Sequence, residues 1–115
     1  MSKCDTALRS LCKQLGPEYR IYCIDLEKCL YRDFRNGFNV EISGVHTTSQ
    51  KRLATLYLWY GEKMIVKTVH DVARSDISNA VDELLRYTEQ LIHDGKDNWD
   101  ALYEIKHSKP NTTNI

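Results

Sequence analysis

The stretch FNVEISGVHTTSQKRLATLYLWYGEKMIVKTV, residues 38–69, contains three apolar runs that are separated by a polar loop and a tight turn. In the first run Phe38, Val40 and Ile42 alternate with polar residues. Alternation places successive side chains on opposite faces of a strand, so this run predicts a half-buried antiparallel strand. Residues 44–52 then form a polar loop between strands.

The second and third runs predict two further strands. In the second run Leu56 and Leu58 can face a core, while Tyr57 and Trp59 lie on the other face. The turn that follows contains Gly61, and the third run, MIVKTV, begins soon after it. This order predicts an antiparallel meander.

The segment before this meander adds a helix and more strand. Residues 5–15 place apolar side chains at helical spacing, and a Gly-Pro pair ends this helix. Residues 19–34 contain alternating strand-like positions with a predicted break at Glu27-Lys28. An Asn-Gly pair then supplies the hairpin turn into the first quoted run.

Two helices follow the meander. The first has Ser75 as its predicted N-cap, carries an apolar stripe that includes Ile77 and Leu84, and ends at Gly95. Such a stripe packs a helix against a sheet. A shorter helix is predicted over residues 98–106.

The sequence therefore predicts an α+β fold with the order α-β-β-β-(β)-α-α. Its antiparallel sheet has three or four strands, and its helices pack mainly on one face. We assign residues 1–106 to one domain and residues 107–115 to a flexible polar tail.

The composition is that of an ordinary globular chain. Its 115 residues are 42% hydrophobic and 28% charged, with a formal net charge of zero. Zero net charge argues against a nucleic-acid binder held by bulk charge. No apolar run approaches the ~20 residues that cross a bilayer, and the N-terminal residues do not resemble a signal peptide. We expect a cytoplasmic protein with no membrane contact and with four reduced cysteines.

Charge is unevenly distributed along the chain. Residues 1–67 contain eleven Lys or Arg against seven Asp or Glu, a net +4, whereas residues 68–115 contain five against nine, a net −4. This polarity is typical of two faces of opposite sign or of a solvated acidic helix.

The sequence contains no pattern typical of a catalytic or metal site. Cys23 and Cys29 have the wrong spacing for a zinc knuckle, and neither a nucleophile elbow nor a Gly-rich phosphate loop is present. His70-Asp71, at a strand-to-helix junction, is the one plausible catalytic pair, and residues at such junctions more often begin a helix. We predict a protein that is not an enzyme and that has no catalytic residues, cofactor or metal.

Protein binding is the leading interpretation. If helices cover one face of the sheet, the other presents Tyr31, Tyr57, Trp59 and Met64. Aromatic residues are enriched at the energetic centres of protein interfaces. We therefore expect a protein partner, while a homodimer through the open sheet face is another way to cover these groups.

Nucleic-acid binding is the alternative. The element order matches the double-stranded-RNA-binding domain, although acidic residues stand where the last helix of that domain needs lysines. Exposed aromatic side chains beside lysines could also stack the bases of a single strand. The residues of this alternative surface are Arg32, Arg35, Lys51, Arg52, Lys63 and Lys67.

Residues 37–100 resemble the small phage anti-CRISPR proteins of the type II-A inhibitor group. The resemblance is carried by FNVEISG, a Thr/Ser loop, an apolar strand, a tight turn, MIVKTV and an amphipathic helix. It implies an α-β-β-β-α-α fold and a protein that acts without catalysis. Such inhibitors occupy the basic cleft where an RNA-guided nuclease reads the duplex beside its target, with acidic groups in place of DNA phosphates.

The resemblance also implies contact residues. The binding turn corresponds to Gly61-Glu62, and the acidic junction between the helices to Asp94, Asp97 and Asp100. This chain departs from the group in its neutral charge and in the additional segment YRIYCIDLEKCLYRDF. With Tyr57 and Trp59, these five residues form the predicted surface of an inhibitor or adaptor whose partner is a protein such as a CRISPR effector nuclease.

Overall fold

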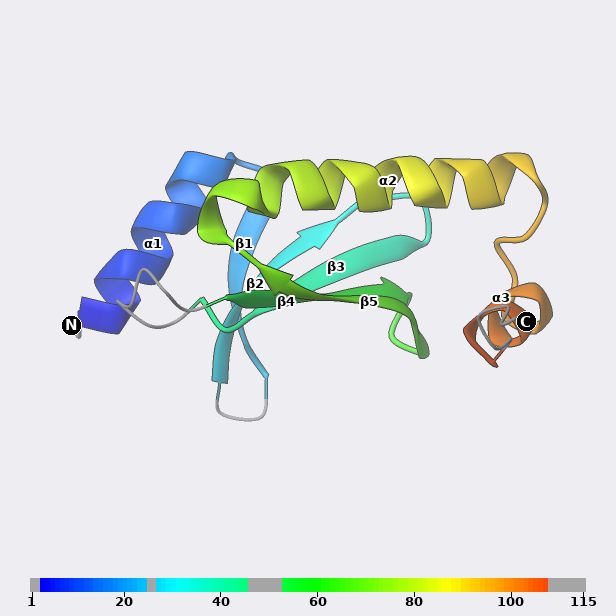
Figure 1. Cartoon of the computed structure of the whole chain (residues 1–115), viewed down its shortest axis with the longest axis horizontal. Coiled ribbons are helices and arrows are strands. Elements are labelled where there is room, and N and C mark those ends of the chain that lie inside the picture. Colours follow the sequence, from blue (N-terminus) through cyan, green and yellow to red (C-terminus); the bar gives the residue numbers. More distant parts are fainter. Residues whose placement is uncertain (1–2, 25–26, 46–52, 108–115) are drawn as a thin grey trace, which may run out of the picture.

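A computed structural model describes residues 3–24, 27–45 and 53–107, and the predicted α+β fold and element order are confirmed (Figure 1). In chain order the elements are α1 (Lys3–Leu15), β1 (Tyr19–Ile24), β2 (Glu27–Asp33), β3 (Phe38–Ser43), β4 (Ala54–Tyr60), β5 (Met64–Val72), the 3-10 turn η1 (Arg74–Asp76), α2 (Ile77–His93) and α3 (Trp99–His107). Apart from His107, the predicted polar tail lies outside the described residues.

The sheet has five strands in the order β1-β2-β3-β4-β5, each antiparallel to its neighbours. The prediction of three or four strands was too low because Glu27 and Lys28 were interpreted as a break. Both residues belong to β2, where they pair with Ile24 and Cys23 of β1. Charged residues are tolerated there because β1 and β2 form a hairpin at the edge of the sheet.

The core lies between one face of the sheet and helices α1 and α2. The sheet contributes the buried residues Phe38, Val40, Ile42, Leu56 and Leu58, and the helices contribute Leu8, Leu11, Ile77, Val81, Leu84 and Leu91. Burial of each large aliphatic side chain stabilises the fold by about 1.5–3 kcal/mol. Buried Thr88 accepts a hydrogen bond from Asn36 Nδ2 at 3.0 Å, which connects α2 to the β2–β3 loop.

Both ends of α2 are defined by backbone geometry. The prediction of Ser75 as the N-cap was wrong, because the 3-10 turn η1 includes Ser75 and α2 begins after Asp76. At the other end Gly95 has φ +69°, and the N–H of Lys96 donates to the carbonyl of Leu91 at 2.8 Å. Gly95 N–H also donates to Ile92. These bonds form a Schellman motif, which ends the helix where the sequence predicts.

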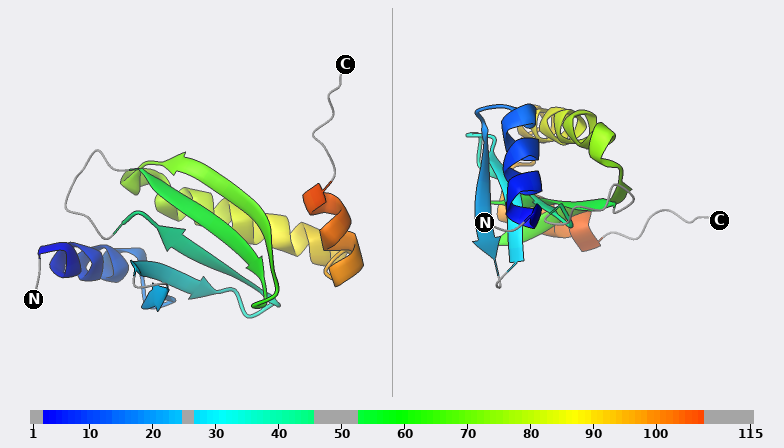
Figure 2. Two further views of the ribbon diagram at one scale, coloured as in Figure 1. Left: turned by 90° about the horizontal axis from the view of Figure 1, so that it is seen from below. Right: turned by 90° about the vertical axis from the view of Figure 1, so that its left-hand side faces the viewer.

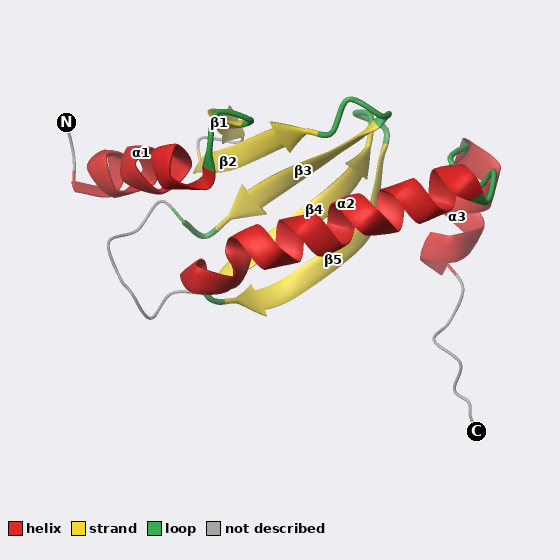
Figure 3. Ribbon diagram, turned by 90° about the horizontal axis from the view of Figure 1, so that it is seen from above, coloured by secondary structure: helices red, strands yellow, loops and turns green. Residues whose placement is uncertain are grey.

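The helices lie mainly on one side of the sheet, as predicted. Figures 1 and 3 show α2 lying over the sheet and running roughly along β4 and β5, with α1 on the same side near β1. Figure 2 shows the same arrangement from two further directions, with α3 beyond the far end of α2. Helix α3 packs against β5. Within the described ranges, no helix has the length and apolar character needed to cross a membrane.

Candidate functional site

The face of the sheet opposite α1 and α2, here called the outer face, is built from the alternate positions of the strands. Residues in β3 and β4 alternate between buried side chains toward the core and partly exposed ones on the outer face. Pairing places Arg20 opposite Tyr31, Tyr31 opposite Glu41, and Glu41 opposite Tyr57. One row of outer-face side chains therefore crosses four strands.

Two tyrosines of the first hairpin stack on this face. The rings of Tyr22 and Tyr31 are 4.5 Å apart between centroids and lie within 6° of parallel. They are diagonal neighbours on adjacent strands, which is within reach of aromatic side chains. Tyr22 remains 43% exposed. Burial, followed by the charges of Asp33 and Glu62, raises the pKa of Tyr31.

Trp59 is held in place by Glu41. Its indole Nε1 donates a hydrogen bond to Glu41 Oε1 at 3.1 Å, and the hydroxyl of Ser43 donates to Glu41 Oε2 at 3.0 Å. Trp59 is half-buried, so part of its ring is accessible on the outer face. The Glu41 carboxylate thus fixes the orientation of a large aromatic surface before any partner binds.

A hollow of about 360 Å³, here called the tryptophan hollow, lies between these two aromatic groups. It is lined by Tyr22, Tyr31, Asn39, Glu41, Trp59, Gly61 and Glu62. Asn39 Nδ2 donates to the Gly61 carbonyl at 2.9 Å, which ties the β4–β5 turn to β3. The predicted Trp59, Gly61 and Glu62 therefore lie together, and the structure adds Tyr22, Asn39 and Glu41, which the sequence did not single out.

Two residues of the predicted aromatic surface do not line the tryptophan hollow. Tyr57 is half-buried on the outer face opposite Glu41, in the row beside the tryptophan hollow but not in its lining. Met64 is only 5% exposed and belongs to the core, so its predicted place on the outer face was wrong. It pairs with Tyr60, whose ring packs on buried Phe38 at 5.4 Å between centroids.

The predicted acidic junction lies at the end of the molecule where β4 ends. The Tyr60 hydroxyl donates to the Asp97 carbonyl at 3.3 Å, which joins the junction to β4. Asp94 and Asp100 are exposed, with Asp100 in the first turn of α3. Hydrogen bonds from Gln90 and then His93 hold the pKa of the Asp94 carboxyl below its usual value.

The basic residues of the alternative surface are spread over different parts of the molecule. Lys67 pairs with core-facing Leu58, and its Nζ lies 4.7 Å from the ring centroid of Tyr87 on α2. Lys63 lies in the β4–β5 turn, beside a recess that it shares with α3. Lys51 and Arg52 lie outside the described residues. Among the described residues, only Arg32 and Arg35 come together in one recess.

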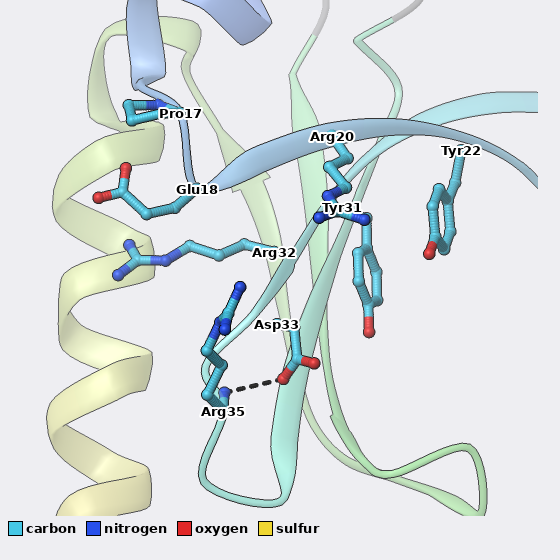
Figure 4. Close-up of a pocket in the computed structure, with 8 residues that line it drawn as sticks. All are labelled: Pro17, Glu18, Arg20, Tyr22, Tyr31, Arg32, Asp33 and Arg35. Carbon is cyan, nitrogen blue, oxygen red and sulfur yellow. Dashed lines mark hydrogen bonds between the residues drawn. The ribbon is translucent and has the colours of Figure 1, made fainter.

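That recess, here called the arginine pocket, has a volume of about 410 Å³ and lies where β1 begins and β2 ends (Figure 4). Its lining consists of Arg20, Arg32, Arg35, Glu18, Asp33, Pro17 and the stacked Tyr22 and Tyr31. Figure 4 shows Arg32 and Glu18 pointing toward α2, whereas Arg20 lies beside Tyr31. The guanidinium of Arg32 lies 5.5 Å from the Tyr19 ring centroid and 5.3 Å from that of Phe34.

The loop that carries Arg35 is fixed by backbone contacts. Arg35 has φ +59°, and its N–H donates to Asp33 Oδ1 at 2.8 Å. In the hairpin turn that the Asn-Gly pair predicted, the residues with positive φ are Arg35 and Gly37. The side-chain oxygen of Asn36 accepts a hydrogen bond from the N–H of Phe38 at 3.1 Å. Asp33 therefore helps to set the place from which the Arg35 side chain extends.

The groups considered for metal binding and catalysis do not cluster. Within residues 3–24, 27–45 and 53–107, no set of three or more His, Cys, Asp or Glu side chains could hold a metal ion. His70 and Asp71 are exposed at the end of β5, where Asp71 has φ +59°. Cys12 is a half-buried thiol whose pKa is raised by burial, and Cys29 is buried.

Comparison of the chain with models of protein families, with curated proteins and with solved structures gave no match.

Proposed function

We propose that the chain is a non-enzymatic inhibitor or adaptor that binds another protein through the outer face of its sheet. The observation that carries this proposal is the tryptophan hollow, where Trp59 is fixed by Glu41 beside the Tyr22–Tyr31 stack. Rigid aromatic rings with part of their surface accessible are the groups that contribute most to protein interfaces. Helix α2 lies on the opposite side of the sheet (Figure 1), and α3 lines a separate recess beside Trp59.

A test of this proposal is capture of partners by tagged protein with and without nuclease treatment of the lysate. A stoichiometric protein partner that survives nuclease treatment is the expected result. Recovery that vanishes with the nucleic acid contradicts the proposal and favours the nucleic-acid alternative, for which added salt should weaken binding steeply.

The narrower proposal is that this partner is an RNA-guided CRISPR nuclease. Two observations support it: Glu62 lies in the β4–β5 turn, and the junction of Asp94, Asp97 and Asp100 is tied to the end of β4 by the Tyr60 hydroxyl. Carboxylates gathered at one end of a protein can occupy a basic cleft that receives DNA phosphates.

A cleavage assay with a purified type II-A nuclease and its guide RNA tests the narrower proposal. The chain should inhibit cleavage of target DNA, and the triple variant Asp94→Asn/Asp97→Asn/Asp100→Asn should lose inhibition while remaining folded. Glu83→Asn/Glu89→Asn, which removes exposed charge from α2, is the control and should still inhibit. Absence of inhibition by the unmodified chain contradicts the nuclease proposal but not partner binding as such.

A further inference from the structure

The tryptophan hollow and the arginine pocket meet at the Tyr22–Tyr31 stack, which lines both. Because the two recesses adjoin at these rings, we take them together as one groove that runs from β1 toward the β4–β5 turn. Arg20 lies opposite Tyr31, and Tyr31 lies opposite Glu41. Because neighbouring strands are about 4.8 Å apart, the backbones of Arg20 and Glu41 are separated by ~10 Å. This length suits a few residues of extended chain.

The two ends of the groove carry opposite charge. At the arginine end, the guanidiniums of Arg20 and Arg35 form no hydrogen bond or ion pair with the residues that the structure describes. Asp33 and Glu18 also line this end, but Asp33 accepts the Arg35 N–H, and Glu18 points toward α2 (Figure 4). Two arginines are therefore available to an anionic group.

At the other end, the charges belong to carboxylates. Both carboxylate oxygens of Glu41 accept hydrogen bonds, one from Trp59 and one from Ser43. The exposed carboxylate of Glu62, in the β4–β5 turn, belongs to the same hollow. Among the residues that the structure describes, no lysine or arginine lines the tryptophan hollow. A basic group placed there would meet two carboxylates, while an anionic group would be repelled.

We propose that this groove binds an extended segment of a partner protein. The segment carries a carboxylate at the arginine end, an aromatic side chain between Tyr22 and Trp59, and a lysine or arginine at the Glu62 end. This inference rests on the proposed function and specifies the chemistry of the partner.

Charge and shape favour this occupant over two others. A single-stranded nucleic acid is uniformly anionic, so a strand that satisfied Arg20 and Arg35 would bring further phosphates against Glu41 and Glu62. A second copy of the chain in a symmetric pair would place the same hollow face against itself and leave the hollows unfilled. An extended segment with opposite charges at its two ends satisfies both ends and fills the space between them.

The test is selection of peptides from a display library with a fixed central tryptophan and random flanking residues, using the full chain as bait. Enriched peptides should carry Asp or Glu on one side of the tryptophan and Lys or Arg on the other. The variant Arg20→Glu/Arg35→Glu should bind these peptides about tenfold or more weakly and should select basic residues on both sides. The control Arg9→Glu/Arg86→Glu reverses exposed charges on α1 and α2 and should leave the selection unchanged.

Several outcomes overturn the inference. The selected peptides could lack opposite charges at their two ends and still lose binding in Trp59→Ala. That result would contradict the proposed charge pattern but not the proposed function. A selection that enriches no peptide would also overturn the inference, because a groove that binds an extended segment must enrich peptides that fit it. Binding of oligothymidylate that is lost in Arg20→Glu/Arg35→Glu would assign the groove to nucleic acid. A dimer that dissociates in Glu62→Arg would assign it to a second copy.

Discussion

At the scale of single residues, the outer face depends on diagonal contacts between neighbouring strands. Tyr22 stacks on Tyr31, and Trp59 donates to Glu41. Each such cross-strand pair contributes about 0.2–1 kcal/mol to stability, which is small compared with the core. Under the proposed function their larger effect is on binding, because side chains that are already ordered lose less entropy when a partner binds.

The contact between Glu41 and Trp59 can be tested directly. Glu41→Ala removes the acceptor of the indole N–H, so we expect faster local motion of Trp59 and a loss of about 1 kcal/mol in the free energy of unfolding. Fluorescence anisotropy decay in a Trp99→Phe background reports the motion of Trp59 alone. Glu41→Gln keeps an acceptor oxygen and should behave like the parent chain. Equal mobility in both variants would show that this hydrogen bond does not hold the ring.

Two half-buried tyrosines predict a loss of stability at high pH. Burial raises the pKa of Tyr31 and of Tyr87 in the folded protein. Their contribution is fully present below the unfolded pKa of about 10 and is lost as the pH rises through the higher folded pKa, since the unfolded chain releases these protons more easily. Urea unfolding at increasing pH should show this decline.

The variant Tyr87→Phe identifies the residue responsible, because it removes one half-buried phenol and should make the decline in the free energy of unfolding less steep. Tyr103→Phe removes a phenol from a side chain that is 51% exposed and serves as the control. An identical alkaline profile for Tyr87→Phe and the parent chain would contradict the prediction.

At the scale of elements, alternation along a strand predicted the faces well and pairing between strands poorly. Leu56, Leu58, Tyr57 and Trp59 lie on the faces that their order in the chain predicts. Tyr60 is two residues after Leu58, so the same alternation places its side chain on the core face. Met64 pairs with Tyr60 across the strands and therefore belongs on the core face as well. The error at Met64 therefore came from an incomplete use of the pattern.

The register of the first hairpin is different, because nothing in the local sequence specifies it. The pairing that brings Tyr22 beside Tyr31 depends on β1 ending at Ile24 and β2 beginning at Glu27. The charges of Glu27 and Lys28 led to the prediction of a break at the place where β2 begins. The neighbours Glu41 and Trp59 are eighteen residues apart in sequence and become adjacent only through the pairing of β3 with β4. Hence single residues of the site were predictable, but its shape was not.

The end of α2 provides a prediction at this scale. Gly95 has φ +69°, and a Cβ at this position would meet no atom within 4 Å. Gly95→Ala should therefore cost only the backbone strain of a left-handed residue, about 1–2 kcal/mol. Chemical denaturation measures this loss, and Gly95→Asn should recover part of it because Asn tolerates this conformation. If Gly95→Ala left the free energy of unfolding unchanged, the Schellman motif would not require glycine at this position.

At the scale of the whole molecule, the proposed binding surface lies on one side of an elongated body. Its principal extents are 46 × 33 × 25 Å, with α1 toward one end and α3 toward the other (Figure 1). One side of the sheet is committed to the core with α1 and α2, and the other carries the groove. The hairpin β1–β2 supplies the arginine end and the tyrosine stack, so it extends the proposed binding face to the edge of the sheet.

The most direct test of the outer face is the affinity of a captured partner protein for three versions of the chain, measured by titration calorimetry. The double variant Tyr22→Ala/Trp59→Ala removes two aromatic groups of the hollow, and truncations of this kind at interface centres cost about 2–4 kcal/mol each. Tyr103→Ala removes a comparably exposed, stacked tyrosine from α3 and serves as the control. We expect the double variant, shown to be folded by circular dichroism, to lose the partner while Tyr103→Ala retains it. Undiminished binding by the folded double variant would contradict the assignment of the outer face as the binding surface.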